Sequence, residues 1–418
     1  MRRNIGCYGL DHVLARRHFM LGAAAGVGLT GLIRPAAAAR LKRDQKRILQ
    51  IYLQGGVSQL ESWDPKPGTE FGGPFRAIPT SVPGLHISEL LPYTAKKMHR
   101  LSVVRSINLK TNDHTLGRIF MEKGRRNGEF PYLGAVASKY LTPDNSPLPG
   151  YIHISTRGIN DQTVAFLGAK HAQLKLEGVN PPSNLKRPDH LAETADRRRN
   201  ELRLRLNRRF TVRRRKAAIE SYDASFEQAA QLIARKEMFA GGATTSDLHR
   251  YGSHDFGRNC LLALRLLEEG ATCVKVTHHG YDSHAENFNF HLEQLGEFDR
   301  TFATLLDDIA ERGMLESTLV MVMSEFGRTP KINHRYGRDH WGTSLSVALG
   351  GCGLQPGAVI GKTNKKGTAV ADREVDARHL FHTYLQALGL DSAAEHDIPG
   401  RSIPIGDPTA GPIQELLA

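Results

Sequence analysis

Acidic, imidazole and hydroxyl side chains gather in five short segments of this 418-residue chain. Imidazoles and carboxylates suit divalent zinc, manganese or iron as ligands, and two such ions can hold the attacking and leaving oxygens of a transferred phosphoryl or sulfuryl group. The segments therefore predict metal-assisted hydrolysis of a phosphate or sulfate ester. They occupy residues 55–67, 112–117, 277–284, 324–330 and 337–342.

The candidate metal ligands come from four of these segments. We expect Asp282, His284 and His340 to hold one divalent ion, and Glu325, together with Glu61, to hold a second. Zinc is the favoured ion, with manganese or calcium as alternatives.

Each of these residues also has an ordinary interpretation. Asp282 and His284 can be a pair in a surface loop, and Glu325 can form a local ion pair with Arg328. His340 can be a capped core histidine. One shared pocket explains all of them together, which favours the site.

The candidate catalytic residues are Thr115, His114 and Arg328. A hydroxyl near divalent ions can lose its proton and attack phosphorus or sulfur, so Thr115 is expected to face the substrate. His114 is the competing nucleophile, or a third metal ligand. Arg328 is expected to stabilise charge on the equatorial oxygens.

The five segments must be positioned by strands and helices, and four β-rich runs precede them. The later two runs are almost continuously apolar, as in parallel strands buried on both faces. Helical patterns at 260–269 and 290–312 lie between runs, and the second ends at Gly313. This order predicts an α/β fold, a three-layer sandwich with a mostly parallel central sheet, in which polar residues meet beyond the carboxyl ends of the strands. The runs are residues 47–53, 101–107, 271–277 and 318–323.

The composition is that of a globular protein, with 40% hydrophobic and 24% charged residues, which excludes disordered and collagen-like chains. The net charge of +13 lies in two places. Residues 1–39 hold five arginines and one acid, and residues 197–216 hold ten arginines, one lysine and one glutamate, so the rest is close to neutral. A specific nucleic-acid-binding surface is therefore not indicated.

The N-terminus is typical of a twin-arginine signal peptide over residues 1–39. Arg16 and Arg17 precede an uncharged run at 20–33 and a small-residue stretch at 36–39. We expect the twin-arginine export machinery to deliver the protein to the periplasm or the extracellular space. No later stretch is long and apolar enough to predict a transmembrane span in the mature form. Cys260, Cys273 and Cys352 lack metal or redox spacing and are expected to be buried thiols.

A charged, helix-forming excursion is expected at about 187–240 within a domain that spans 40–418. Ten arginines cannot all be paired locally, so residues 197–216 are either a solvated helical arm or a contact for a polyanion or an anionic lipid surface.

At the motif residues the chain resembles a bacterial secreted family, domain of unknown function 1501, which is placed in the alkaline phosphatase and sulfatase-like superfamily. The resemblance extends from about Arg47 to Ile405, and it implies an alkaline phosphatase-like fold and a metal-dependent hydrolase. The sulfatase signature, Cys or Ser followed by x-Pro-x-Arg, is absent around the cysteines. The motifs are Gly55-Gly56-x-Ser58-Gln59-x-x-x-Trp63-Asp64-Pro65-Lys66-Pro67, Asp113-His114-Thr115, Asp282-x-His284-x-x-Asn287-Phe288, Ser324-Glu325-Phe326-Gly327-Arg328-Thr329-Pro330 and Gly337-Arg338-Asp339-His340-Trp341.

The sequence thus predicts an exported, metal-dependent hydrolase-like protein that cleaves phosphate or sulfate esters of a small molecule or a polysaccharide. The alternative, on the same fold, is a catalytically diminished protein that binds a polysaccharide or another envelope component.

Overall fold

The computed structural model describes residues 45–158, 162, 164–180, 191–211, 216–235, 237–240, 242–398 and 400–417. The twin-arginine segment predicted at 1–39 lies outside these residues. The chain divides into a unit at Met1–Asp44, which is not described, and a unit at Gln45–Ala418, which holds every element named below.

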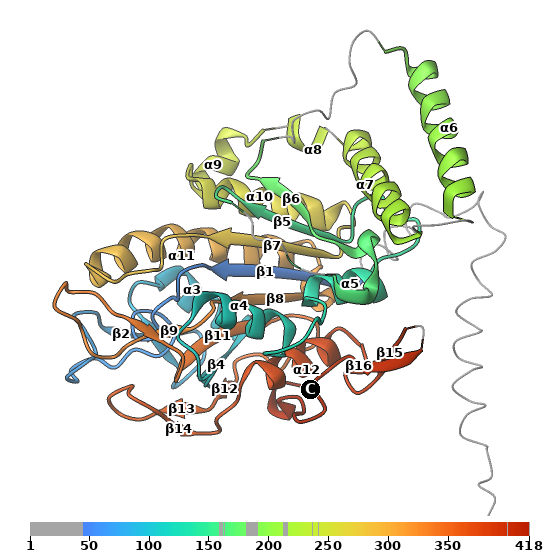
Figure 1. Ribbon diagram of the computed structural model, residues 1–418. Helices are drawn as coiled ribbons and strands as arrows, with labels where there is room; N and C mark the ends of the chain where they lie inside the picture. Colours follow the sequence, from blue (N-terminus) through green and yellow to red (C-terminus); the bar gives the residue numbers. More distant parts are fainter. Residues whose placement is uncertain are drawn as a thin grey trace, which may run out of the picture. The chain divides into compact units, whose positions relative to one another are not determined.

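A central sheet of eight strands, in the order β12-β4-β11-β8-β1-β7-β5-β6, forms the middle layer (Figure 1). Its strands pair in parallel except β11, which is antiparallel to both β8 and β4. The carboxyl ends of β1, β4, β7 and β8 therefore lie at one edge. The strands are β1 (Arg47–Leu53), β4 (Leu101–Ile107), β5 (Tyr151–Ser155), β6 (Leu174–Glu177), β7 (Cys273–His278), β8 (Thr318–Met323), β11 (Leu345–Gly350) and β12 (Val359–Ile360).

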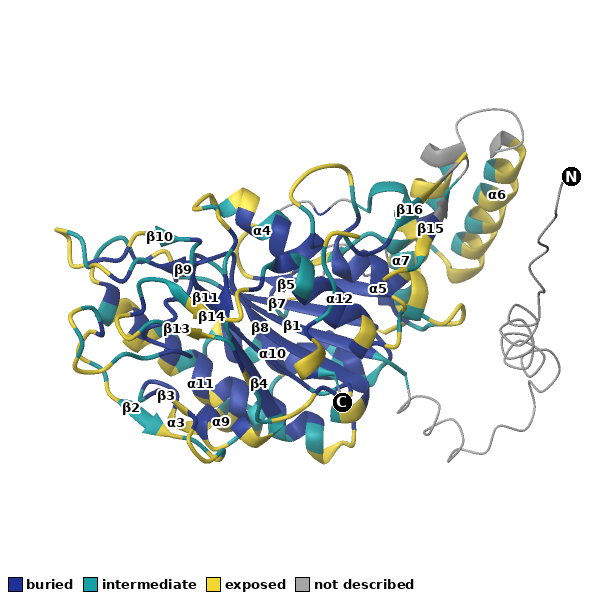
Figure 2. Ribbon diagram, turned by 90° about the horizontal axis from the view of Figure 1, so that it is seen from below, coloured by how far each residue is buried: buried dark blue, intermediate teal, exposed yellow. Residues whose placement is uncertain are grey.

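Alternating side chains of the central strands supply two separate cores. On β1, Leu49 and Ile51 belong to one core, and Ile48 and Tyr52 to the other. Both faces of a strand point inward when helices cover both faces of its sheet, so β1 is buried along its whole length. Figure 2 shows these strands in dark blue at the centre.

Helices cover the two faces of the sheet and complete the three layers. One core includes buried residues of α9 (Thr245–Tyr251), α10 (Asp255–Glu268) and α11 (Asn287–Glu311). The other includes buried residues of α4 (His114–Lys123), α5 (Leu133–Leu141) and α12 (Ala377–Ala387). The predicted fold class, an α/β three-layer sandwich with a mostly parallel sheet, is confirmed.

The remaining elements are short or lie outside the sandwich. Three helices, α6 (Glu193–Thr211), α7 (Lys216–Ala234) and α8 (Glu237–Ala240), fall in the stretch predicted as an excursion. The others are α3 (Pro92–Ala95) and the small hairpin strands β2 (Ala77–Pro79), β3 (His86–Ser88), β9 (Gly327–Arg328), β10 (His340–Trp341), β13 (Lys362–Thr363), β14 (Val370–Asp372), β15 (Glu395–Ile398) and β16 (Arg401–Pro404).

The predicted bounds of β1, β4 and β8 agree with the structure. The remaining predicted strand, expected at 271–277, is β7 and runs over Cys273–His278. The helix expected from residue 260 begins at Asp255, because the His254 side chain accepts the Gly257 N–H and caps the helix there. The three described cysteines are buried and free, as expected. Among the described helices, none combines the length and hydrophobicity that crossing a bilayer requires.

Candidate metal and anion site

The N-terminus of α4 brings His114 to the carboxyl edge of the sheet. The Asp113 side chain accepts the Leu116 N–H and fixes the first turn, which makes His114 the first helical residue. Its Nδ1 lies 2.8 Å from Oε1 of Glu325, which follows β8. Glu325 is buried and also accepts the Gly55 N–H at 2.9 Å.

Two other histidines have the same arrangement. Nδ1 of His284 lies 2.9 Å from a carboxylate oxygen of Asp339, and Nδ1 of His340 lies 2.8 Å from the carbonyl oxygen of Asn112. When each of these imidazoles is neutral, with its proton on Nδ1 and directed at this oxygen, its Nε2 lone pair is available to a metal ion. Metal-bound histidines show this pattern, because the acceptor fixes the tautomer and the ring orientation.

The three Nε2 atoms converge on Asp282, in the loop after β7. The distances to its carboxylate oxygens are 3.4 Å from His114, 3.1 Å from His284 and 3.2 Å from His340. The Nε2 atoms of His284 and His340 are 2.9 Å apart. Within the described residues, His114, Asp282 and His340 are a group of His, Cys, Asp and Glu that meets the spacing for a metal ion.

These ligand atoms lie close enough together to share one divalent ion. Zinc binds imidazole nitrogen and carboxylate oxygen at about 2.0–2.2 Å, so neighbouring ligand atoms in a tetrahedron lie roughly 3.3–3.5 Å apart. The four separations of 2.9 to 3.4 Å lie close to that range. His114, Asp282, His284 and His340 are the candidate ligands, and an ion held by three of them, such as His114, Asp282 and His340, would keep one position open for a substrate oxygen.

The electrostatics of the site couple His114 to both carboxylates. Hydrogen bonds to Asp282 and Glu325 raise the pKa of His114 to about 9. Burial alone would raise the pKa of Asp282, but hydrogen bonds from His114, His340 and Arg328 lower it well below its ordinary value. At neutral pH the metal-free site therefore holds a cationic His114 between two anions, and a metal ion would take the place of its proton.

Arg328 is fully buried and does not face the cavity. Its Nε donates to the Gly56 carbonyl oxygen at 2.9 Å, its Nη2 donates to the Gly55 carbonyl oxygen, and Nη2 also lies 2.5 Å from Asp282. The predicted role on substrate oxygens does not fit this position. Arg328 orients the Asp282 carboxylate and ties it to the loop after β1.

Glu61 lies apart from the histidines. It is fully buried and forms a two-bond ion pair with Arg338, at 2.8 Å and 3.1 Å. Arg338 also donates to the Phe71 carbonyl oxygen at 2.9 Å and the Thr329 carbonyl oxygen at 3.0 Å. The pair joins the loop after β1 to the segment that precedes His340, so Glu61 is not among the ligands we propose. Glu325, expected as a ligand, instead accepts the hydrogen bond that orients His114.

Close backbone contacts set the position of two loops. Gly55 has φ of 120°, and a Cβ there would lie 2.4 Å from the Asp282 nitrogen. Gly117 lies in the middle of α4, where a Cβ would lie 2.4 Å from the Glu325 carbonyl oxygen. Only glycine permits these approaches, which bring Asp282 and His114 together.

A cavity of about 510 Å³ opens beside the ligand cluster. Thr115 lies in its wall with an exposed side chain, as expected of a residue that faces a substrate. Arg118, which is not among the residues predicted for the site, also lines the cavity. The signal for Arg118 was its spacing of four residues from His114, which places both on one face of α4. Arg157 and His279 also line the cavity.

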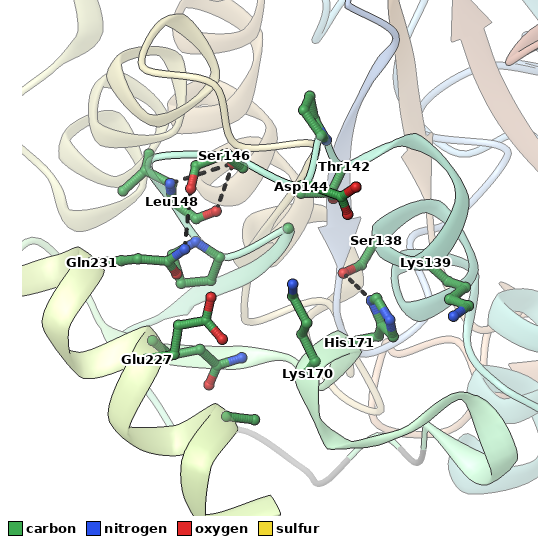
Figure 3. A pocket seen from close by; sticks show the side chains of 15 residues that line it. Ser138, Lys139, Thr142, Asp144, Ser146, Leu148, Lys170, His171, Glu227 and Gln231 are labelled. Carbon is green, nitrogen blue, oxygen red and sulfur yellow. Dashed lines mark hydrogen bonds between the residues drawn. The ribbon is translucent and has the colours of Figure 1, made fainter. Parts of the chain in front are cut away.

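A second cavity, of about 200 Å³, lies between α5, the turn at Ala169–His171 and α7 (Figure 3). Ser138 bonds to His171 at 3.1 Å, and Gln231 donates to the Ser146 carbonyl oxygen at 3.1 Å. None of the residues predicted for the site lines this cavity. The candidate site is therefore the histidine cluster.

Comparison with known proteins identifies a family. A family model described as "Protein of unknown function (DUF1501)" matches residues 45–417. A search of curated proteins finds no match.

Solved structures of similar fold include three enzymes. The alkaline phosphatase of the Antarctic bacterium TAB5 is 13% identical, covering 82% of this chain and 98% of that chain, with a TM-score of 0.35. The lipoteichoic acid synthase LtaP of Listeria monocytogenes is 8% identical, covering 90% and 78%, with a TM-score of 0.36. The PsFucS1 sulfatase of Pseudoalteromonas sp. is 12% identical, covering 86% and 72%, with a TM-score of 0.36. Likenesses this distant bear on neither substrate nor chemistry.

Proposed function

This chain belongs to the DUF1501 family of proteins of unknown function, and from the geometry of its site we propose that it is a metal-dependent hydrolase of phosphate or sulfate esters. The observation that carries the proposal is the convergence of three Nε2 atoms on Asp282, each imidazole being held through Nδ1 by its own oxygen acceptor.

The ligand set supports one divalent ion, with zinc favoured by three imidazoles and one carboxylate. When bound, such an ion would supply Lewis-acid stabilisation of the charge that develops on the ester oxygens. Glu325 and Asp339 hold His114 and His284 in place, and Arg328 holds Asp282. Manganese and calcium remain the alternatives to test.

The cavity wall supports an anionic ester group as substrate. Arg118 lines this cavity, and its guanidinium is the proposed donor to oxygens of a bound phosphate or sulfate. Thr115 presents its hydroxyl in the same wall and is the proposed nucleophile. We assign His114 as a ligand rather than as the nucleophile, because its Nδ1 faces Glu325 and its Nε2 faces the ligand cluster at Asp282.

Metal analysis followed by assay tests the proposal. The full chain, stripped with a chelator and titrated with zinc or manganese by calorimetry, should bind one ion and gain turnover of a chromogenic phosphate or sulfate ester. Asp282→Asn and His340→Asn should each lower metal affinity at least tenfold and abolish turnover. His86→Asn, at an exposed histidine of β3, is the matched control and should behave as wild type.

Two outcomes would reject the hydrolase. A chain that stays empty with either metal has no metal centre. A chain that binds metal through Asp282 and turns over neither class of ester fits the alternative, a polysaccharide- or envelope-binding protein.

Export by the twin-arginine route to the periplasm or beyond is the second part of the proposal. Its support is Arg16 and Arg17 before the uncharged run. Cells expressing the double variant Arg16→Lys, Arg17→Lys should retain the protein in the cytoplasm, as fractionation and immunoblotting would show. Unchanged export of the variant would contradict this route.

A further inference from the structure

Helix α6 packs on α7 through one face. Arg203 forms an ion pair with Asp223 of α7 and lies 4.1 Å from the centre of the Phe226 ring. Asn207, one turn later, donates to the same Asp223 carboxylate at 2.8 Å. These contacts define the inner face of α6.

The opposite face carries arginines without partners. Arg198, Arg205 and Arg209, here called the arginine stripe, are exposed and make no ion pair or hydrogen bond with any described residue. At 100° per residue they lie together on the side away from Arg203 and Asn207, and they span about 16 Å of helix.

Neighbouring arginines on the same helix are paired. Arg197 bonds to Glu193 at 3.2 Å, and Arg199 bonds to Asp196 at 3.0 Å. Within the described part of the chain the stripe is therefore a row of cations without ion-pair partners, with Glu201 as the acidic residue within its span. Such a row is repelled internally and is neutralised best by a ligand with several anionic groups along its length.

The exposed leucines of α6 argue against a lipid bilayer as that ligand. Leu202 and Leu206 are one turn apart and share one side of α6, whereas Leu204 lies on the opposite side, so two leucines alone make up the apolar surface and form no face wide enough to insert into a bilayer. Guanidinium groups bind sulfate and phosphate through paired hydrogen bonds. A hydrophilic polymer with repeated sulfate or phosphate groups fits the stripe.

We propose that the arginine stripe of α6 binds a linear polyanionic polysaccharide that bears sulfate or phosphate esters, and so retains the polymer on which the metal site acts. The second clause rests on the proposed function. No residue of α6 lines the cavity beside the ligand cluster, so a ligand that contacts both must carry several ester groups along its length. Small esters should not be affected by the stripe.

Binding to heparin fragments, measured by fluorescence titration from 50 to 300 mM NaCl, tests the docking surface. The triple variant Arg198→Gln, Arg205→Gln, Arg209→Gln should lose at least tenfold in affinity, and its slope of log affinity against log salt should fall by about 2, since each contact contributes roughly 0.7 to 0.9.

The control removes the same charge from paired positions, as Arg76→Gln, Arg197→Gln, Arg199→Gln, and should stay within threefold of wild type. Equal losses in the two triple variants would mean that net charge alone is responsible, and an unchanged stripe variant would mean that α6 does not dock the polymer. Loss of binding to vesicles containing phosphatidylglycerol, with heparin binding unchanged, would assign the stripe to a membrane. Each of these results overturns the proposal.

Turnover separates this inference from the proposed function. In the stripe variant kcat/KM for ester release from a sulfated or phosphorylated polysaccharide should fall at least fivefold, with kcat and the turnover of a p-nitrophenyl ester unchanged. A wild-type chain that binds heparin through the stripe but releases no ester from either substrate would reject the hydrolase and leave the docking surface in place. If the stripe variant and the wild type have equal kcat/KM values for the polymer, the stripe does not retain the substrate of the metal site.

Discussion

Asp282 contacts three histidines and Arg328. Of these partners, Arg328 has two functions. Its guanidinium orients Asp282 toward the histidines, and it also donates hydrogen bonds to the backbone oxygens of Gly55 and Gly56. Its position away from the cavity could not be predicted, because the partners lie 46 to 273 residues away in the chain.

Arg328→Met should reveal both functions. The substitution leaves the buried carbonyl oxygens of Gly55 and Gly56 without a donor and removes the cation beside the half-exposed Asp282 carboxylate, which should lower the free energy of unfolding by about 1–3 kcal/mol in urea denaturation. Zinc affinity should fall about 10–100-fold, since Asp282 loses its orientation. Arg76→Met, at a side chain that is 84% exposed beside Glu89, should change stability by less than about 1 kcal/mol. A stability equal to wild type in Arg328→Met would refute the role.

Among the individual residues, part of the proposed site could be predicted from residue type and part could not. Asp282, His284 and His340 were identified from imidazole and carboxylate groups after strands. Glu61 was predicted to hold a second ion together with Glu325, but its partner Arg338 lies 277 residues away and no local pattern reveals the pair. Arg118 was missed because its spacing of four residues from His114 is informative only once residues 114–118 are known to be helical.

Among the elements, α4 is fixed at both ends. At its start His114 bonds to Glu325, and near its end the buried Glu122 lies 2.6 Å from Lys275 of β7. Between them Gly117 touches the Glu325 backbone. The helix therefore sets the distance from His114 to the other ligands.

Gly117→Ala should move α4 outward. Alanine favours a helix over glycine by about 1 kcal/mol, but the clash with the Glu325 carbonyl oxygen should reverse the sign and cost about 1–3 kcal/mol in urea denaturation. Zinc affinity should fall, because His114 moves with the helix. The matched control is Gly296→Ala in α11, where a Cβ has no neighbour within 4 Å and should stabilise by up to about 1 kcal/mol. Parallel gains in both variants would show that α4 is not held by this contact.

For the whole molecule, the predicted fold class and most strand bounds were correct because buried parallel strands leave long apolar runs between glycines, as at 318–323. The antiparallel β11 was not predicted, since the direction of a strand depends on its connection rather than on its residues. Helix starts at Asp255 and Asn287 were missed because caps are made by single side chains and loop geometry.

Stability should decrease in acid because two histidines are held neutral. Burial, with Lys139 and other cations nearby, lowers the pKa of His171 and of His396 to about 4. The unfolded chain protonates both near pH 6.5, so their contribution is complete above that pH and is lost as the pH falls toward 4. The loss should reach at most about 3 kcal/mol for each histidine.

Urea denaturation between pH 7 and 4.5 measures the slope of the free energy of unfolding against pH. His396→Asn should flatten it, and His86→Asn, at an exposed position, should not. An identical slope in wild type and His396→Asn would show that this histidine is not responsible.

The two edges of the sheet have a consequence for concentrated solutions. One edge strand, β12, has two residues, and the other, β6, has four and exposes Lys175 and Glu177. Short, charged edges offer few free backbone groups to a neighbouring copy. Crowded molecules should therefore resist joining their sheets into fibrils.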